Sequence, residues 1–269
     1  MKSFDKKNVY LVGGSSGIGL AAGKELARRG ANILVMARRE PLLKQAIEAF
    51  QQQAASPDQR FAYLALDASD PKQVEEAVNK ALELIGPPQV LINCAGRAYP
   101  HRFEDVTFDQ FDETMRVNLY GAWNLTAACL PHMNAGGHIV HTSSVAGLIG
   151  VFGYTDYCAS KFAVIGFCEA LRGELKPRNI AVSVLCPPDT DTPGFETENT
   201  TKPEETKAIS GSVKLMSPDD VAKALLKGMV SESFLIIPGF ESRGSVLIKR
   251  IWPGLVQWIM DREVDKVRK

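Results

Sequence analysis

Short apolar runs recur along the chain, and most are followed by a longer stretch in which apolar residues return every three or four positions. A short apolar run predicts a buried strand, and the longer spacing predicts a helix with one buried face. The predicted strands span residues 8–12, 33–37, 61–66, 90–93, 138–142, 180–186 and 234–237.

Several predicted helices are bounded by residues that suit helix ends. The predicted helices span residues 18–29, 40–53, 71–85 and 154–176, and residues 107–133 are also helical in pattern. Gly30 and Gly86 follow the first and third of them, and Ser217 with Pro218 predicts the start of another. Strands that alternate with helices predict an α/β fold with a parallel sheet covered on both faces.

Composition excludes several classes of protein. The 269 residues suffice for one large domain; 45% of them are hydrophobic and the net charge is zero, which argues against disorder and against a nucleic-acid partner. The five cysteines are scattered without a C-x-x-C pair, a spacing typical of reduced thiols and not of a zinc site or disulfide frame, so we predict no metal. Residues 1–7 lack the apolar region of a signal peptide. We therefore expect a cytoplasmic protein, or one at the cytoplasmic face of a membrane.

A glycine-rich turn lies between the first predicted strand and the first predicted helix. Glycines in this position allow the backbone to approach a pyrophosphate closely, and the helix N-terminus then binds the anion. The turn predicts a dinucleotide site formed by Gly13, Ser15, Ser16, Gly17, Ile18 and Gly19.

The same turn also has the form of a hydrolase nucleophile elbow, Gly13-x-Ser15-x-Gly17. An α/β-hydrolase needs an acid and then a histidine later in the chain than its serine. All four histidines precede residue 142, and the elbow belongs to a strand deeper in the sheet, which weighs against a hydrolase. His138 and His141, on the fifth predicted strand, are interpreted as structural.

The residues after the second predicted strand indicate which dinucleotide is bound. A carboxylate there would bind the ribose 2′-hydroxyl of NAD, whereas Arg38 and Arg39 offer guanidinium groups that suit a 2′-phosphate. This favours NADPH as the cofactor. Asp67 and Ala68, after the third strand, are placed to meet the adenine.

Tyr157 and Lys161 are four positions apart and lie on one face of a predicted helix. An ammonium beside a phenol stabilises the phenolate and lowers the pKa of the phenol. Reduction of a carbonyl needs a proton donor, because hydride attack leaves an alkoxide. The pair therefore predicts an acid catalyst for carbonyl reduction.

Together these motifs resemble the short-chain dehydrogenase/reductase family. The resemblance covers residues 5–240 and adds Asn93-Cys94-Ala95-Gly96, Asn118 and Ser144, which precedes Tyr157 by thirteen residues. Val12 and Cys94 depart from the usual Thr and Asn. The resemblance implies a single-domain Rossmann-type doubly wound sheet, an oxidoreductase activity and a homo-oligomer, either a dimer or a tetramer.

The resemblance also implies a role for each catalytic residue. Tyr157 would donate the proton, Lys161 would lower the pKa of Tyr157 and bind the nicotinamide ribose, and Ser144 would orient the carbonyl. Asn118 would hold a helix backbone carbonyl and a water that connects Lys161 to solvent. Further cofactor contacts are expected from Asn93, Ala95, Gly96, Tyr157, Lys161, Pro187, Thr190 and Thr192.

Residues 187–206 resemble one branch of this family, the 3-ketodihydrosphingosine reductases. Pro187-Pro188 stands where most members have Pro-Gly. The branch implies a long-chain lipid ketone with an amino group as substrate. A steroid or a 3-oxoacyl thioester is the alternative substrate, and a non-catalytic NADP(H) sensor is the alternative class of protein. Such sensors typically lack the active-site tyrosine, which is present here.

The domain organisation divides near residue 243. Residues 1–243 form the NADP(H)-binding domain, which includes a substrate loop at 188–215 whose polar composition predicts a mobile lid. Residues 244–269 form an apolar and basic segment, with three more basic than acidic residues over 249–269. Lys249, Arg250 and the Pro253-Gly254 pair leave it too broken to span a bilayer. It suits either peripheral contact with a membrane or packing on its own domain or a partner subunit.

Overall fold

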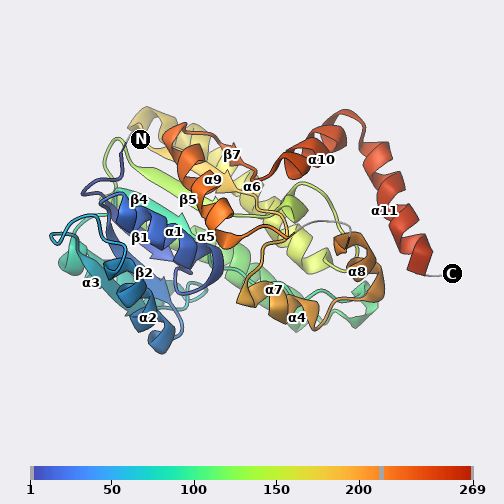
Figure 1. Ribbon diagram of the computed structural model, residues 1–269, viewed down its shortest axis with the longest axis horizontal. Helices are drawn as coiled ribbons and strands as arrows, with labels where there is room; N and C mark the ends of the chain where they lie inside the picture. The colour runs from blue at the N-terminus through green and yellow to red at the C-terminus, as the bar shows by residue number, and fades with distance from the viewer. Residues whose placement is uncertain (1–2, 212–214, 268–269) are drawn as a thin grey trace.

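The computed structural model describes residues 3–211 and 215–267, and its centre is one parallel sheet of seven strands with helices on both faces (Figure 1). The spatial order is β3-β2-β1-β4-β5-β6-β7, so the chain builds outward from β1 in one direction and then in the other. The predicted doubly wound fold is confirmed. The strands are β1 Asn8–Val12, β2 Asn32–Ala37, β3 Phe61–Ala65, β4 Val90–Asn93, β5 His138–Thr142, β6 Ala181–Leu185 and β7 Leu235–Ile236.

The helices follow the predicted pattern. Apart from residues 107–133, the bounds of the predicted strands and helices agree with the structure to within two residues, and Ser217 caps α9 by accepting a hydrogen bond from the Asp220 backbone N–H at 3.1 Å. The helices are α1 Gly17–Arg28, α2 Glu40–Gln51, α3 Pro71–Ile85, α4 Phe108–Met115, α5 Gly121–Cys129, α6 Thr155–Leu175, α7 Pro193–Asn199, α8 Glu204–Ser210, α9 Pro218–Val230, α10 Phe240–Ile251 and α11 Pro253–Val267.

Alternation along each strand divides the core into two layers. Tyr10 of β1 packs in the layer that includes α3, α5 and α6, whereas its neighbour Leu11 packs in the layer that includes α1, α2 and α9. Both side chains are fully buried. Successive side chains on a strand point to opposite faces, so a strand covered on both faces must be apolar at nearly every position. This explains the uninterrupted apolar runs in the sequence.

The region predicted as helical over 107–133 is not one regular helix. A π-helical turn, η2 Arg116–Tyr120, joins α4 to α5, and a short 3-10 turn, η3 Leu130–His132, follows α5. Asn118 lies in the π-helical turn and is buried. Wide turns of this kind are frequent at functional sites, and the periodicity of the sequence did not indicate this one.

The segment 188–215, predicted as a mobile loop, contains two short helices, α7 and α8. Thr192 caps α7 by accepting a hydrogen bond from the Phe195 backbone N–H at 3.1 Å, and Pro193 begins the helix. Thr206 of α8 is buried and donates to the Phe152 carbonyl at 2.9 Å. Some of its polar groups thus serve as caps and buried hydrogen-bond partners, and the mobility of the segment stays a prediction. Residues 212–214 lie outside the described residues.

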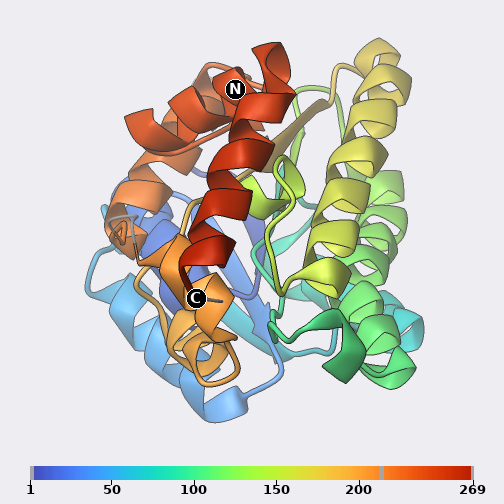
Figure 2. The ribbon, with the colours of Figure 1, turned by 90° about the vertical axis from the view of Figure 1, so that its right-hand side faces the viewer.

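The C-terminal segment forms an arm of two helices, α10 and α11, which extends from the β7 end of the sheet (Figure 1). Helix α11 runs back toward residues 188–215, the substrate segment, and contacts α8. In Figure 2, α11 lies in front of α8. Val256 is buried, whereas several large apolar side chains are exposed: Phe240, Leu247, Ile248, Ile251, Trp252, Trp258 and Ile259. Among residues 3–211 and 215–267, no helix is long and apolar enough to cross a membrane. Residues 268–269 lie outside the described residues.

Two helical glycines provide a matched test of the packing. A Cβ on Gly23 of α1 would lie 2.2 Å from the buried Phe50 ring, whereas a Cβ on Gly173 of α6 meets nothing within 4 Å. We expect Gly23→Ala to lower the free energy of unfolding by about 1–3 kcal/mol through overpacking. Gly173→Ala should raise it by about 0.5–1 kcal/mol, since alanine favours a helix. Urea unfolding followed by circular dichroism measures both, and an equal effect of the two substitutions would contradict this packing.

Candidate active site

The glycine turn is pressed against the end of β4. Gly13 has a φ of +73°, and a Cβ there would lie 2.5 Å from the Ala95 backbone nitrogen. A Cβ on Gly19 would lie 2.2 Å from the Gly13 carbonyl oxygen, and a Cβ on Gly17, which has a φ of +52°, would lie 3.0 Å from the Thr192 methyl. Gly13 and Gly19 therefore have no room for a side chain, and the backbone at Gly17 is strained for any residue with one. A backbone cradle without side chains is what a pyrophosphate needs for close approach.

The residues between these glycines begin helix α1. Ser16 is its N-cap and has an extended backbone, but its hydroxyl makes no capping hydrogen bond. Ser15 is buried, and Ile18 packs against the core layer of α1. The first amides of a helix lack partners within the helix and carry partial positive charge. The predicted anion site at residues 13–19 is thus consistent with the observed turn.

The predicted adenosine contacts lie at the ends of β2 and β3. Arg38 and Arg39 follow β2 and are exposed, and neither forms an ion pair among the described residues. Asp67 accepts hydrogen bonds from the Ser69 backbone N–H at 3.0 Å and from its hydroxyl at 2.8 Å. The Ala68 carbonyl accepts from the Asn124 side chain at 3.0 Å.

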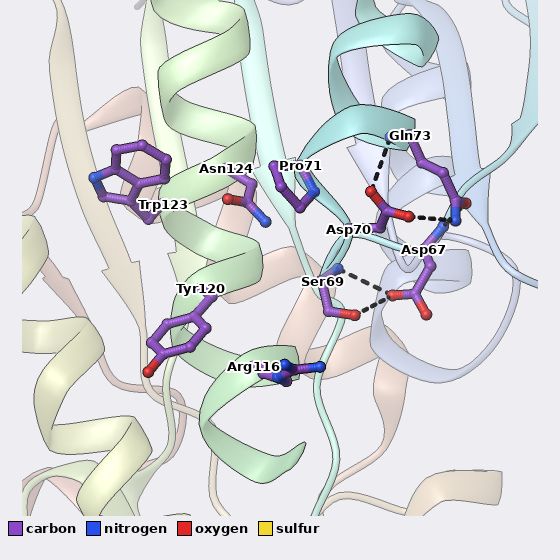
Figure 3. A pocket seen from close by; sticks show the side chains of 9 residues that line it. All are labelled: Asp67, Ser69, Asp70, Pro71, Gln73, Arg116, Tyr120, Trp123 and Asn124. Atoms are coloured by element: carbon purple, nitrogen blue, oxygen red, sulfur yellow. Dashed lines mark hydrogen bonds between the residues drawn. The ribbon is translucent and has the colours of Figure 1, made fainter. Parts of the chain in front are cut away.

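A pocket of about 600 Å³ opens beside Asp67, between α3 and α5 (Figure 3). Arg116, Tyr120 and Trp123 line it from η2 and α5, and it is also lined by Asp70, the N-cap of α3, and by Gln73. None of the predicted catalytic residues lines it. The pocket is therefore a depression on the helical face of the domain, separate from the catalytic residues.

The end of β4 is held by a buried polar network. The Asn93 side-chain oxygen Oδ1 accepts from the Ala95 backbone N–H at 3.0 Å, and the side-chain nitrogen Nδ2 lies 3.4 Å from His141 Nδ1. His141 Nε2 lies 2.9 Å from the Thr126 hydroxyl, and burial lowers the pKa of His141 to about 3, so the ring is neutral. His138 is likewise buried, with a pKa lowered to about 4 by burial. Both histidines serve the structure, as the sequence predicted.

Tyr157, Lys161 and Ser144 come together at the end of β5. The Lys161 ammonium donates to the Thr142 carbonyl at 2.9 Å and lies 5.5 Å from the centroid of the Tyr157 ring. The Ser144 hydroxyl forms a hydrogen bond with the Tyr157 phenol, while the adjacent Ser143 hydroxyl donates to the Lys161 carbonyl at 2.8 Å. The two serines therefore face different partners, as strand alternation predicts.

Burial governs the charge state of the pair. Burial raises the pKa of Tyr157 above its usual value, the Glu198 carboxylate raises it further, and the hydrogen bond with Ser144 opposes them. Burial also lowers the pKa of Lys161 to about 8. Loss of water disfavours the charged form of both groups, so burial dominates the pKa of Tyr157 here, and the effect of Lys161 on it stays a prediction. At neutral pH the phenol keeps its proton.

Asn118 clamps the loop after β4 onto α6. Its side chain accepts from the Arg97 backbone N–H at 2.9 Å and donates to the Arg97 carbonyl at 3.0 Å and to the Ser160 hydroxyl at 2.9 Å. The carbonyl that it holds thus belongs to a loop and not to a helix, which corrects the expectation. A Cβ on Gly96 would lie 3.1 Å from the Lys161 ammonium and 3.2 Å from the Asn118 side-chain oxygen. Only glycine fits between them without a shift.

The segment after β6 connects the catalytic residues with the glycine turn. The Pro187 carbonyl accepts from the Val145 backbone N–H at 3.0 Å. The Thr190 hydroxyl donates to the Pro188 carbonyl at 2.8 Å, and Thr192 reaches Gly17. The predicted cofactor residues after β6 are thus next to those after β1 and β5.

Sequence reasoning missed a charged cluster beside Tyr157. The Tyr154 hydroxyl donates to Glu198, whose Oε1 lies 3.3 Å from the Lys202 ammonium. Burial raises the pKa of Asp189, and Lys202 opposes this rise. The spacing of Glu198 and Lys202 at i and i+4 indicates an ion pair, but nothing in the sequence indicates that the pair is buried.

The fold and the site define a nucleotide-binding oxidoreductase, and comparison with known proteins agrees. The model of the short chain dehydrogenase family matches residues 7–203. The chain belongs to the short chain dehydrogenase family, and the predicted family and oxidoreductase class are confirmed.

Several longer proteins resemble most of the chain. It is 44% identical over 230 residues to the 3-dehydrosphinganine reductase of Danio rerio and 41% identical over 230 residues to the 3-ketodihydrosphingosine reductase of Bos taurus; each match covers 84% of this chain and 69% of the relative. A 3-ketodihydrosphingosine reductase of Dictyostelium discoideum is 38% identical, with 86% of this chain and 74% of the relative covered.

Solved structures resemble the fold as a whole. A short chain dehydrogenase/reductase of Burkholderia phymatum in complex with NAD superposes with a TM-score of 0.83 at 23% identity, over 95% of this chain and 96% of that one. A dehydrogenase/reductase of Sinorhizobium meliloti gives a TM-score of 0.74 at 27% identity, over 87% of this chain and 93% of that one.

Proposed function

We propose that this protein reduces the ketone of 3-ketodihydrosphingosine to the alcohol dihydrosphingosine, a step of sphingolipid synthesis, with NADPH as the coenzyme. The observation that carries the proposal is the meeting of the Tyr157 phenol, the Ser144 hydroxyl and the Lys161 ammonium at one strand end. Relatives that are 38–44% identical and bear the name of this reductase, or its synonym, support the choice of substrate.

The coenzyme would bind along the ends of β1, β2, β3, β4 and β6. The turn from Gly13 to Gly19, where Gly13 and Gly19 have no room for a Cβ, fits the pyrophosphate, and Asp67 with Ala68 would face the adenine. Asn93, Ala95 and Gly96 would line the middle of the coenzyme, while Pro187, Thr190 and Thr192 would close over its nicotinamide end. When bound, the reduced nicotinamide supplies a hydride to the ketone carbon.

The residues of the chain handle the proton. Burial keeps the Tyr157 phenol protonated at neutral pH, so it is ready to donate to the oxygen of the reduced ketone. The Ser144 hydroxyl would hold that oxygen and share its developing negative charge. With a pKa of about 8, Lys161 is mostly protonated at pH 7 and would stabilise the phenolate left on Tyr157. Asn118 would position Lys161 by holding the loop that carries Gly96.

The proposal competes with three alternatives. A steroid or a 3-oxoacyl thioester could be the ketone that is reduced, or the chain could bind NADP(H) as a sensor without turnover. NADPH oxidation measured across a panel of 3-ketodihydrosphingosine, a steroid ketone and a 3-oxoacyl thioester separates them. We expect the highest kcat/KM with the sphingoid ketone.

Tyr157→Phe removes the proton donor and keeps the ring. It should lower turnover of the sphingoid ketone by about 10²–10⁴-fold, the usual contribution of general acid catalysis, with NADPH affinity unchanged. Steady-state NADPH oxidation and tryptophan fluorescence quenching measure the two effects. Tyr120→Phe, at an exposed tyrosine of η2, is the matched control. Near-normal turnover of Tyr157→Phe would refute the assignment.

The choice of NADPH over NADH rests on Arg38 and Arg39. Both are exposed after β2 without an ion pair among the described residues, and no acid follows that strand before Glu40 of α2. Arg38→Ala should reduce the preference for NADPH by about 1–3 kcal/mol, the range for a hydrogen bond to a charged group. Dissociation constants for NADPH and NADH measure it, with Arg250→Ala as a remote control of equal charge. Equal affinity of the unaltered protein for both coenzymes would exclude this proposal.

The proposed homo-oligomer has a suitable surface. Aromatic side chains are exposed along α4, η2, α5 and α6: Phe108, Phe111, Tyr120, Trp123 and Phe162. An exposed apolar surface of this kind suits contact between copies of the chain. The cytoplasm is the proposed location, because all five cysteines are free thiols.

The helical arm of α10 and α11 is proposed to contact a membrane surface. Its exposed Ile251, Trp252 and Trp258 adjoin Lys249 and Arg250, a combination that suits the interface of an anionic bilayer. The lipid ketone could then enter the site without crossing water, where each exposed methylene costs about 0.8 kcal/mol.

Replacement of Trp252 and Trp258 by alanine tests the membrane contact. The double variant should co-sediment less with anionic liposomes and turn over the long-chain ketone more slowly, with activity on a short soluble ketone retained. Trp123→Ala, at an exposed tryptophan of α5, is the matched control and should bind liposomes normally. If the unaltered protein remains in the supernatant at low salt, the arm is a packing element.

A further inference from the structure

Two carboxylates and one ammonium are gathered in the substrate segment beside Tyr157. Glu198 lies near the C-terminal end of α7, Asp189 precedes that helix and Lys202 follows it. The Glu198 side chain is 16% exposed and that of Lys202 only 1%, with 3.3 Å between the ammonium and Glu198 Oε1. One cation for two carboxylates leaves the cluster with one excess negative charge when all three groups are ionised. Burial makes such an imbalance costly.

The cluster faces the reaction centre. The Tyr154 hydroxyl donates to Glu198, and the Tyr154 and Tyr157 rings lie 5.6 Å apart between centroids. Both Glu198 and Asp189 raise the pKa of Tyr157 through their charges, so both act across a short distance on the phenol. A molecule that presents its carbonyl to Tyr157 would therefore bring its neighbouring atoms close to these carboxylates.

The contacts within the cluster leave an acceptor unused. Tyr154 and Lys202 both approach Oε1 of Glu198, and no donor among the described residues approaches Oε2. The Lys202 ammonium lies 3.9 Å above the Phe195 ring, and within the described part of the chain it has no hydrogen-bond partner despite its burial. The Lys202 ammonium thus has an ion pair but no hydrogen bond among the described residues, and Glu198 keeps Oε2 for a further donor, so a polar ligand that both donates and accepts would fit here.

We propose that Glu198, supported by Asp189, binds the ammonium of the substrate and so makes the enzyme selective for ketones with an amino group on the adjacent carbon. The inference rests on the proposed function. In 3-ketodihydrosphingosine the amino group is on the carbon next to the ketone, so a carbonyl at Tyr157 brings the ammonium within reach of a carboxylate beside that tyrosine. The neighbouring hydroxyl of the substrate offers an oxygen to Lys202.

The charges of the cluster favour an ammonium over a neutral group. A bound ammonium would balance the second carboxylate, and a charge-assisted hydrogen bond is stronger than a neutral one. A ketone without the amino group would leave the excess negative charge in place beside the phenol. The cluster therefore adds affinity for the amino ketone and none for its uncharged analogue, and this difference in affinity makes the site selective.

Glu198→Gln separates charge from shape. The amide oxygen still accepts the Tyr154 hydroxyl, so the contact between α7 and α6 is kept. We expect kcat/KM for 3-ketodihydrosphingosine to fall about 10–100-fold, mainly through KM, which is the loss expected for one hydrogen bond to a charged group. With the analogue that lacks the amino group, 1-hydroxyoctadecan-3-one, kcat/KM should change by less than about threefold, within the scatter of surface substitutions.

Two further variants isolate the cause. Glu196→Gln, at an exposed glutamate of the same helix, removes the same charge at a distance from the cluster and should keep the preference for the amino ketone. Asp189→Asn should weaken that preference, and thermal melting establishes that each variant is folded. If Glu198→Gln lowers kcat/KM for both ketones equally, the glutamate is a packing residue and the inference is wrong.

The unaltered protein distinguishes failure of this inference from failure of the proposed function. If it oxidises NADPH with neither ketone, the proposed function fails. If it reduces both ketones with equal kcat/KM, the proposed reductase activity stands and the recognition of the ammonium by Glu198 is excluded.

Discussion

Parallel pairing in register brings the functional segments of this chain to one edge of the sheet. Val12 pairs with Asn93, Asn93 with His141, and Thr142 with Leu185. The glycine turn follows β1, the loop that contains Gly96 follows β4, Ser144 follows β5 and Pro187 follows β6. Because the strands are parallel, all four lie at the same edge of the sheet. Because β1, β4, β5 and β6 are buried at nearly every position, a shift of register would force their side chains into spaces of another shape, so burial fixes the positions of these loops.

Close contact between backbones at this edge makes side chains impossible at particular positions. The Gly13 and Ala95 backbones meet where β1 and β4 end, and Gly96 lies between Lys161 and Asn118. These contacts hold the turn of the first strand against the loop of the fourth. Burial at the same place keeps the Tyr157 phenol protonated and reduces the basicity of Lys161. The packing that shapes the site thus also determines which group carries the proton at neutral pH.

The sequence predicted the parts of the fold that depend on local pattern. Apolar runs and helix caps located strands and helices to within two residues, since both signals are read along the chain. The π-helical turn at Asn118 escaped prediction, because its wide hydrogen-bond pattern leaves helical periodicity almost unchanged. The burial of Glu198 and Lys202 was not predicted either, because an ion pair at i and i+4 is typical of an exposed helix face and its burial here depends on tertiary contacts. The two short helices in the polar segment 188–215 were not predicted either, because Thr192 and Thr206 use their hydroxyls in contacts that the local pattern does not indicate.

The substrate segment joins the two ends of the proposed reaction. Thr192, the N-cap of helix α7, lies next to Gly17 of the glycine turn, and Glu198 near the end of that helix accepts a hydrogen bond from the Tyr154 hydroxyl. Helix α8 follows, and α11 of the exposed arm contacts it. A displacement of the glycine turn would therefore move Glu198 through the seven residues of α7. A displacement of the arm would move the substrate segment through α8. If the arm contacts a membrane, this series of contacts connects the lipid surface, the recognition of the polar end of the substrate and the coenzyme site. The segment that is least regular in the sequence is then the one that couples all three.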